Sequence, residues 1–451
     1  MTTQRTLIIL ITFVCATLLA IIGLAVIELI PGYLFAQNAR SASTTFNSTP
    51  QTRPRLLGDL NGTTLDYYGD ALMYQLTLAN EDAPLLERML SPLSYAHPTK
   101  RDDGGNDLMA QGLASRLAGQ DPNTLHNHYW DGYRIPLRIF GSVLSYTGLR
   151  VLSGVVLLLL VCATTGALWR VLGRLVALAF LISFLAMYAP IVAWCLQYAP
   201  VFYIAFAGII AVLYLAKKRL LLSHGYLLFL ILGILTSFFD LLTAPLITVG
   251  FPLVVAITCL LRSNLKEDAQ AMLHHGFTWC ALWFVGYAGF WFIKVMLTSA
   301  LLDTTLPGYV SEKTGFYFGG LYPGLNGYIR TFLDAFYRNL GTVLGASFRS
   351  ATYLDPTIRS QARISLLLLV APLLTSWFLS RRRSVNLGTL WLLVAVMLVP
   401  LSRMIIMAAH TSIHDFMTFR EWGVAYFALL VFLGFAIPKL RRATSADLRI
   451  R

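Results

Sequence analysis

The sequence predicts an all-α polytopic membrane protein with about ten transmembrane helices and a large extracytoplasmic first loop. Of its 451 residues, 57% are hydrophobic and only 13% are charged, roughly half the charged fraction of a soluble domain. The apolar residues come in blocks of about 17–25, the length that crosses a hydrocarbon core. Basic residues collect at every second junction between these blocks. Length, composition and charge therefore indicate the same class of protein.

The apolar blocks divide the chain into spans and loops. We expect spans near residues 7–30, 151–168, 175–192, 201–216, 222–239, 244–261, 276–298, 364–380, 387–406 and 421–437. The resulting regions are a first transmembrane helix (1–30), an extracytoplasmic loop subdomain (31–149), the first part of the bundle (150–299), a second extracytoplasmic loop (300–363), the last part of the bundle (364–438) and a basic tail (439–451).

Lys and Arg at the junctions set the expected orientation. The basic junctions are marked by Arg5, Arg170 and Arg174, Lys217 to Arg219, Arg262 and Lys266, Arg381 to Arg383, and Lys439 to Arg442. The positive-inside rule then places both termini in the cytoplasm. The runs at 129–134, 238–243 and 414–420 resemble those of bacterial membrane proteins, which implies a bacterial cytoplasmic membrane. Because these local signals account for the net charge of +13, nucleic acid is not an expected partner.

The first loop is the main polar region of the chain. It holds eleven of the 22 acidic residues. A loop of this length without secondary structure is unusual, so we expect a small subdomain or juxtamembrane helices. Short amphipathic helices are predicted at 64–80 and 107–117. Apolar residues spaced by three and four predict an interfacial helix at 134–146.

Four polar clusters lie on the expected outward side, and the first contains two candidate catalytic residues. Asp66 and Asp70 are four residues apart and would share one face of a helix. A carboxylate at this place could act as a general base toward a hydroxyl group. The pair could also contribute to a hard-cation site. The alternative is a solvated turn, which Asp and Gly favour.

The second cluster precedes the second span. His126, His128 and Asp131 are candidate metal or substrate ligands, although the His-x-His spacing alone is a weak metal signal. Arg134 and Arg138, at helical spacing, suit a phosphate or diphosphate at the membrane surface. The alternative is an aromatic belt with arginines that extend to the interface.

The other two clusters lie at the outward ends of later spans. Asp240 stands between two apolar blocks and must face water, a cavity or a partner. His410 and His414, again four apart, could transfer protons or bind a metal. Arg420 could bind phosphate or pair with Glu421. Structural pairing of Asp240 and an interfacial cap around the histidines are the alternatives. The middles of the spans are almost free of charge, which favours an outward surface site over a conduction path.

The order of these features resembles the GT-C class of membrane glycosyltransferases. In that class a cytoplasmic N-terminus and one helix precede an acidic first outer loop and a multi-helix bundle. The resemblance implies that Asp66 or Asp70 is the catalytic carboxylate and that Arg134, Arg138 and Arg420 bind the donor phosphate. The sequence departs from the class in three ways. Its acidic group lies some thirty residues beyond the first helix, no adjacent acidic pair occurs near Asp66, and the loop is unusually long.

The resemblance implies transfer of a sugar from a polyprenyl-linked donor to an acceptor on the outer side, which could be a glycan, a lipid or a protein. A divalent cation is a candidate cofactor, and membrane lipids are expected partners. Two alternatives stay open. One is a transporter or flippase for a lipid-linked or polar substrate, and the other is a non-enzymatic membrane assembly protein. If the chain is an enzyme, the four clusters should converge at one place.

Overall fold

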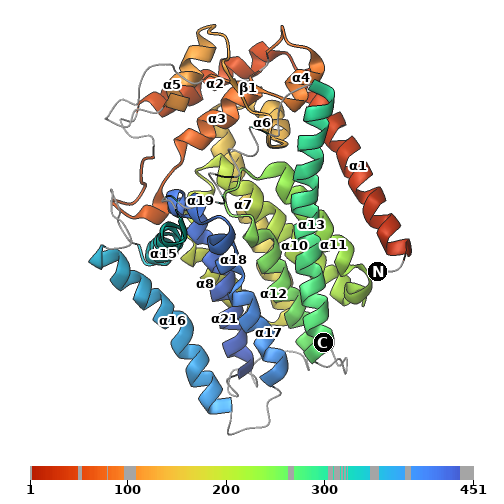
Figure 1. The fold of residues 1–451 in the computed structure, drawn as a ribbon, viewed down its shortest axis with the longest axis vertical. Helices are drawn as coiled ribbons and strands as arrows, with labels where there is room; N and C mark the ends of the chain where they lie inside the picture. The colour runs from red at the N-terminus through yellow and green to blue at the C-terminus, as the bar shows by residue number, and fades with distance from the viewer. Residues whose placement is uncertain are drawn as a thin grey trace.

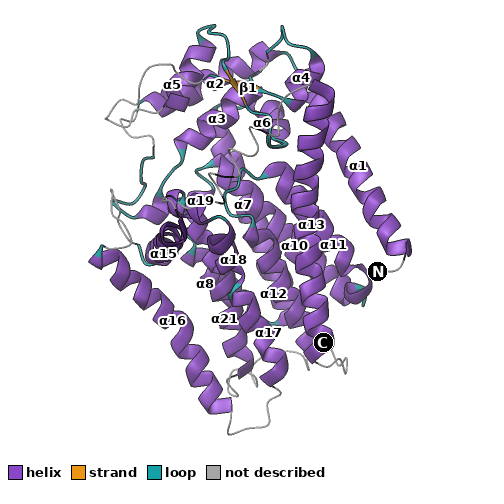
Figure 2. Ribbon diagram, viewed as in Figure 1, coloured by secondary structure: helices purple, strands orange, loops and turns teal. Residues whose placement is uncertain are grey.

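The computed structural model describes residues 3–48, 53–78, 80–95, 108–262, 269–302, 324–345, 355–380 and 387–436, with single positions between 303 and 323. Helices make up nearly all of this described chain, and loops gather at one end of the molecule (Figures 1 and 2). Its two named strands, β1 (Leu93–Ser94) and β2 (Thr124–Leu125), form one short antiparallel pair. The all-α membrane class predicted from the sequence is confirmed.

Seven helices among the described residues are long and apolar enough to cross a membrane. Six of them are α1 (Thr3–Glu28), α7 (Tyr146–Leu172), α10 (Ala199–Lys217), α11 (Leu221–Phe239), α13 (Ala269–Leu302) and α16 (Pro356–Ser380). The seventh runs Asp415–Ala436 and ends with α21 (Trp422–Ala436). The shorter apolar helices are α8 (Arg174–Ala186), α12 (Leu246–Arg262), α17 (Leu387–Met397) and α18 (Val399–Ile406). Each of the ten expected blocks therefore coincides with helical structure.

Two expected spans are interrupted. The block 175–192 divides into α8 and the short α9 (Ala189–Val192), because Tyr188 adopts a left-handed backbone conformation with φ 54°. The block 387–406 divides into α17 and α18 next to Pro400, whose ring lacks the N–H group that a continuous helix would use. These breaks place polar segments at the end of the bundle where loops gather.

Close helix packing in the bundle depends on small residues. A Cβ atom on Gly233 of α11 would lie 2.0 Å from the carbonyl oxygen of Trp283 on α13. A Cβ on Gly286 of α13 would lie 2.3 Å from the carbonyl oxygen of Leu230. The two glycines therefore let the backbones of α11 and α13 meet, as small residues commonly do between membrane helices.

The described residues between 32 and 145 form a cap over one end of the bundle (Figure 1). The cap contains α2 (Gly32–Asn47), η1 (Asn61–Thr63), α3 (Tyr67–Thr77), α4 (Leu85–Leu90), the two strands, α5 (Leu108–Leu117) and α6 (Arg134–Gly141). The predicted helices at 64–80, 107–117 and 134–146 correspond to α3, α5 and α6, whereas α2 was not predicted. Rings of Phe46 and Tyr146, with centroids 4.9 Å apart, pack the cap onto the start of α7.

The expected second loop is partly helical. Within it, α15 (Gly324–Val343) is seen nearly end-on in Figure 1, so it lies across the cap end while α16 runs along the bundle. The short α19 (Ala408–Ile413), α20 (Asp415–Thr418) and η3 (Phe419–Glu421) lie at the same end. Most of 303–323, all of 346–354 and the basic tail from 439 lie outside the described residues.

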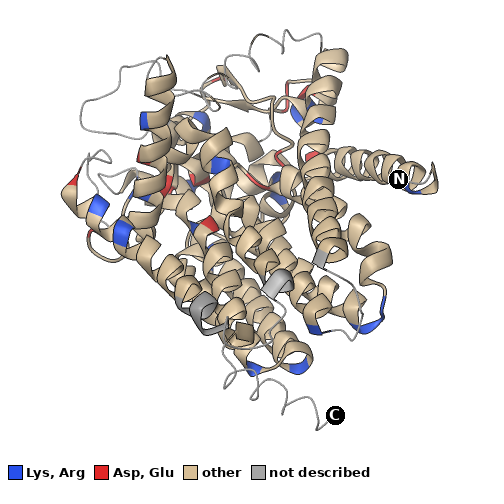
Figure 3. Cartoon of the chain, turned by 60° about the horizontal axis from the view of Figure 1, so that its bottom comes forward, with Lys and Arg blue, Asp and Glu red and all other residues tan. Residues whose placement is uncertain are grey.

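Charge is distributed unequally along the bundle. At the end of the bundle remote from the cap, the charged residues drawn are Lys and Arg, whereas both signs of charge occur nearer the cap (Figure 3). Arg170, Lys217 and Arg262 each stand in the last turn of their helices. Lys294 of α13 departs from this pattern. Its side chain is fully buried and donates to Leu90 O and to Thr298 Oγ1.

Candidate functional site

Asp66, the first of the two candidate catalytic residues, is the N-cap residue of α3. Its carboxylate accepts a hydrogen bond from the backbone N–H of Gly69 at 3.4 Å, a capping role that Asp commonly fills. The Gln197 amide nitrogen donates to its second oxygen at 2.5 Å. Arg53 Nε lies 3.7 Å from the carboxylate, and 37% of the Arg53 side chain is exposed. Asp66 is thus buried but adjoins a cation that reaches solvent.

Asp70 lies one turn further along α3 and faces the same segment. Its carboxylate accepts from Tyr146 Oη at 2.7 Å and from the backbone N–H groups of Leu196 and Gln197 at 3.2 and 3.1 Å. Because its side chain is fully buried, desolvation raises the pKa of Asp70 to about 6, partly offset by these hydrogen bonds. Both carboxylates share a face, as predicted, but Asp70 is enclosed and fastens α3 to the turn before α10.

Arg53 connects the cap to the segment that precedes the last helix. Its guanidinium carbon lies 4.5 Å from the centroid of the Phe416 ring, a cation–π distance. Neighbouring His414 is partly buried, and its ring centroid is 4.5 Å from that of His410. Burial, with smaller contributions from Arg53 and Arg403, lowers the pKa of His414. Its imidazole is therefore neutral at pH 7 and able to accept a hydrogen bond.

Asp415 fixes the same segment from its other side. Its carboxylate accepts from Arg338 Nε of α15 at 3.1 Å and from Asn61 Nδ2 of the cap at 3.2 Å. Asn61 also donates to Thr342 Oγ1 at 3.1 Å. The cap, α15 and α20 consequently meet at one buried carboxylate, which holds His414 in place.

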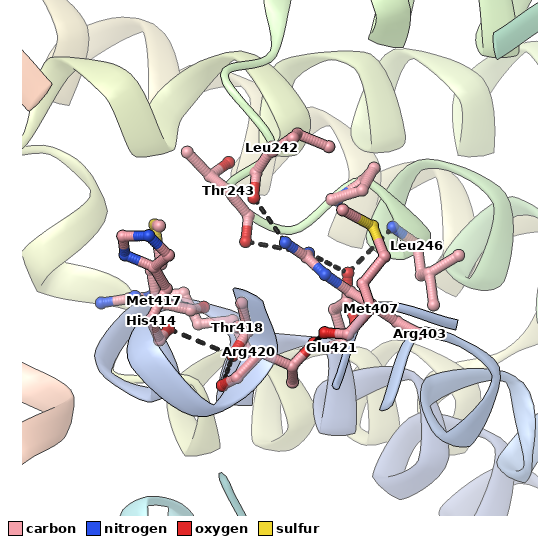
Figure 4. A network of polar contacts seen from close by, with 12 residues as sticks. Leu242, Thr243, Leu246, Arg403, Met407, His414, Met417, Thr418, Arg420 and Glu421 are labelled. Carbon is pink, nitrogen blue, oxygen red and sulfur yellow. Dashed lines mark hydrogen bonds and ion pairs between the residues drawn. The ribbon is translucent and has the colours of Figure 1, made fainter. Parts of the chain in front are cut away.

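Arg403 is the centre of a second buried network, shown in Figure 4. Its guanidinium forms an ion pair with Glu421 at 2.7 Å and donates to the carbonyl oxygens of Leu242 at 2.5 Å and Thr243 at 3.1 Å. A further nitrogen contact reaches His410 Nδ1 at 3.2 Å. Leu242 adopts φ 59°, which costs energy for a residue with a side chain. Arg403 therefore holds a strained turn between α11 and α12.

Asp240 belongs to this turn. Its Oδ1 accepts from the backbone N–H of Thr243 at 3.0 Å and from Thr243 Oγ1 at 2.5 Å. Among the described residues, no hydrogen-bond partner reaches its buried Oδ2. The chain Asp240, Thr243, Arg403, His410 and His414 thus links the third and fourth sequence clusters. Arg53, which lies over Phe416 of the same segment, connects that segment to Asp66.

Arg420 is buried beside this chain of contacts. It donates to Phe416 O at 2.9 Å and to Gly62 O at 3.2 Å, and its guanidinium stacks 4.3 Å from the Tyr198 ring centroid. With only 1% of its surface exposed, it holds the cap loop against the bundle. A phosphate could reach it only by replacing these bonds.

The second sequence cluster meets the third through its backbone, where Gly132 N–H donates to Phe238 O at 2.8 Å, but its two arginines are engaged elsewhere. Arg134 pairs with Glu28 at 2.6 Å, and Arg138 donates to the carbonyl oxygens of Thr77 and Ile30 at 2.9 and 2.7 Å. Both arginines are 2% exposed. They hold the cap on the end of α1, and a donor phosphate at Asp66 would not meet them.

The histidines of this cluster also lie away from Asp66. His126 Nε2 is 3.5 Å from Asp131 Oδ1, and the rings of His126 and His128 are 4.7 Å apart. Asp131 also accepts from Tyr133 Oη at 3.1 Å. In the described part of the chain, no group of three or more His, Cys, Asp or Glu residues has the geometry to hold a metal ion.

Sequence reasoning missed several residues of the site. Arg403 carried a usable signal, since an arginine inside an apolar block is a functional candidate by default. Arg53, Gln197, Asn61 and Arg338 carried none, because polar residues in loops and helix ends are common.

No protein-family model matches the sequence, and comparisons with curated proteins and with solved structures yield no match. Function is therefore inferred from the geometry of the site alone.

Proposed function

We propose that this protein is a membrane glycosyltransferase that moves a sugar from a polyprenyl-phosphate-type donor to an acceptor hydroxyl at the cap end of the bundle. The observation that carries the proposal is the position of Arg53, which lies 3.7 Å from Asp66 and over the ring of Phe416. These residues come from the first loop and from the segment before the last helix, and they lie where the polar cap rests on apolar helices. A lipid-linked phosphate substrate needs such a boundary.

The proposed reaction uses Asp66 as the general base. Its carboxylate takes the proton of the acceptor hydroxyl as the acceptor oxygen forms a bond to the anomeric carbon of the donor. The bond from that carbon to the phosphate oxygen breaks, and the leaving phosphate keeps the electron pair. Arg53 stabilises the charge of this phosphate, because its guanidinium is partly exposed and only 3.7 Å from Asp66. Asp70, enclosed by its own donors, positions α3.

Ten membrane-crossing segments and cytoplasmic termini belong to the same proposal. The basic helix ends remote from the cap support this orientation, since basic residues favour the cytoplasmic side (Figure 3). The cap and its site then face the extracytoplasmic space, in a bacterial cytoplasmic membrane. The acceptor there is a glycan, a lipid or a protein.

The test is Asp66→Asn in the full-length protein, with Asp59→Asn as the matched control. Asp59 lies in the same loop, but 59% of its side chain is exposed. Purified protein is incubated with a panel of polyprenyl-phosphate and polyprenyl-diphosphate sugars together with cell-envelope acceptor extract, and release of the lipid phosphate is measured. We expect release by the wild type and by Asp59→Asn, and a loss of about 100-fold or more in Asp66→Asn, as for removal of a general base.

Whole-cell glycan analysis of a deletion strain that carries each variant gives the second readout. Equal glycan profiles for wild type and Asp66→Asn would overturn the role of Asp66. Movement of a lipid-linked sugar across vesicles without release of lipid phosphate would instead identify a transporter or flippase. Loss of an envelope complex in the deletion strain, with neither reaction present, would identify a non-enzymatic assembly protein.

A further inference from the structure

A cavity of about 190 Å³ lies apart from the Asp66 site, beneath the other side of the cap. At about 30 Å³ per molecule in the liquid, its volume corresponds to roughly six waters. Its polar lining comes from α1, the α4 region and α6, in the residues Glu28, Asn80, Glu87, Arg88, Ser91 and Arg134. The cavity is therefore large enough for a small polar group and lined by both signs of charge.

The position of the cavity relates it to the membrane surface. Glu28 is the last residue of the candidate span α1, and Leu302 is the last residue of the candidate span α13, and both line the cavity. Further lining residues are apolar, among them Leu78 and Leu125. The cavity thus opens where two spans leave the hydrocarbon, at the depth of lipid headgroups.

Several polar atoms around this cavity have unused hydrogen-bonding capacity. Among the described residues, no partner reaches Ser91 Oγ, Arg88 Nε or Arg134 Nε, although all three atoms are buried. Ser91 is only 6% exposed. A buried polar group without a partner destabilises the fold. Of these side chains Arg88 is the accessible one, at 19% exposed, so an oxyanion in the cavity would meet its guanidinium first, with Ser91 Oγ and Arg134 Nε in the layer behind it.

The charges also favour a ligand that carries both signs. Glu28 is shared by Arg134 at 2.6 Å and Arg88 at 3.8 Å, so the two arginines retain one net positive charge between them. Glu87 is exposed at the rim, and no ion pair joins it to another described residue. The cavity is therefore positive at its inner end, beside the two arginines, and negative at its rim, beside Glu87. A phosphate followed by an ammonium group has the complementary order of charges.

We propose that this cavity binds the headgroup of a zwitterionic phospholipid such as phosphatidylethanolamine. Its phosphate lies against Arg88 and Ser91, with Arg134 behind them, and its ammonium group lies toward Glu87. The acyl chains continue past Leu302 into the membrane beside α13. This lipid site is independent of the proposed glycosyl transfer, because it lies at the far end of α3 from Asp66.

The test measures the midpoint of thermal unfolding of the full-length protein in detergent, during titration with phosphatidylethanolamine, phosphatidylglycerol or inorganic phosphate. A ligand that binds only the folded state raises this midpoint. We expect phosphatidylethanolamine to give the largest shift at equal concentration, phosphatidylglycerol a smaller one, and inorganic phosphate none. An equal shift with inorganic phosphate alone would overturn the lipid assignment, and equal shifts with the two lipids would overturn the role of the ammonium group.

Two variants test the phosphate end and the ammonium end of the lipid site separately. Arg88→Gln should weaken binding of phosphatidylethanolamine by about tenfold or more, the value of a charge-assisted hydrogen bond. Glu87→Gln should weaken it by up to about fivefold and leave phosphatidylglycerol binding unchanged. Asp82→Asn is the control, since Asp82 is exposed in the same region and does not line the cavity.

A loss of fold in Arg88→Gln would show as a lower unfolding midpoint without lipid. In that event Ser91→Ala provides the second measurement, because it removes one donor and little volume. Retention of the full phosphatidylethanolamine shift by Ser91→Ala and by every folded Arg88 variant would overturn the proposal.

Discussion

The side-chain amide nitrogen of Gln197 lies 2.5 Å from Asp66 Oδ2, while the backbone N–H of the same residue donates to Asp70. Gln197, in the turn before α10, therefore orients both carboxylates of α3. This approach is possible because Gly69 stands between them: a Cβ atom there would lie 2.0 Å from Gln197 Oε1.

Gly69→Ala should displace Gln197 and destabilise the protein by about 1–3 kcal/mol, the usual cost of overpacking a buried site. Its measure is the thermal unfolding midpoint in detergent. Gly166→Ala in α7 is the matched control, because nothing lies within 4 Å of a Cβ at that position. If both variants unfold at the same temperature, the contact between Gln197 and α3 does not hold the site.

Arg53→Lys should lower kcat/KM for the lipid-linked donor by about tenfold or more, because lysine cannot reproduce the forked contact of a guanidinium with phosphate. The unfolding midpoint should change little, since Arg53 is half-exposed and its pair with Asp66 is long. Donor-dependent kinetics check this. If Arg53→Lys lowers kcat and leaves KM unchanged, Arg53 acts in the chemical step and not in donor binding. If the variant keeps full activity, Arg53 has no role in the reaction.

Arg403→Leu should destabilise the protein by about 3–5 kcal/mol, because it leaves Glu421 buried without its partner. The double variant Arg403→Leu with Glu421→Leu should be less destabilised than the sum of the single changes. A double-mutant cycle on unfolding free energies measures this coupling. The partly exposed pair of Arg55 and Asp59, with nitrogen and oxygen 3.9 Å apart, is the comparison, and its coupling should stay below about 1 kcal/mol. Additive effects at Arg403 and Glu421 would contradict the network in Figure 4.

The free energy of unfolding should depend on pH through Asp70. Burial raises the pKa of its carboxyl from 3.8 to about 6, so the folded state binds this proton more tightly than the unfolded state. The contribution is complete below pH 4 and is lost as the pH rises to about 6. The loss corresponds to about 3 kcal/mol.

Asp70→Asn lacks this titration, and the difference between its stability and that of the wild type isolates the effect. Measurements from pH 4 to pH 7 should show the wild type losing stability relative to Asp70→Asn across that window. Asp59→Asn, which changes an exposed carboxylate, should follow the wild type. If the difference in unfolding free energy between the wild type and Asp70→Asn is the same from pH 4 to pH 7, Asp70 is ionised in the folded state over that whole range.

Apolar block length was enough to locate the helices, because the membrane imposes the same length on every span. It could not locate the breaks at Tyr188 and before Pro400, because block length does not report the left-handed backbone of one residue or where a proline begins a new helix. Helix α2 also escaped prediction, since its buried Phe35 and Phe46 face the cap and not lipid. The local sequence pattern of α2 does not show whether its apolar residues will pack against the cap or face lipid.

The candidate site was predictable in part. Spacing put Asp66 and Asp70 on one face, but it could not distinguish the carboxylate beside Arg53 from the one enclosed by Tyr146 and backbone N–H groups. Arg134 and Arg138 have the spacing of phosphate ligands, yet they bind Glu28 and backbone carbonyl oxygens. An arginine's partners are set by tertiary structure, because phosphate, carboxylate and carbonyl oxygens suit the same guanidinium.

The strained turn at Leu242 has a consequence for biosynthesis. Its two carbonyl oxygens are held by Arg403, which is itself held by Glu421, so residues made early depend on residues made some 160 and 180 positions later. A nascent chain that stops after α13 contains Asp66, Asp70 and Asp240 but lacks the cation that shapes the turn. Insertion of the final helices is thus the step at which this end of the protein matures, and C-terminally shortened chains should reach the membrane without acquiring a finished site.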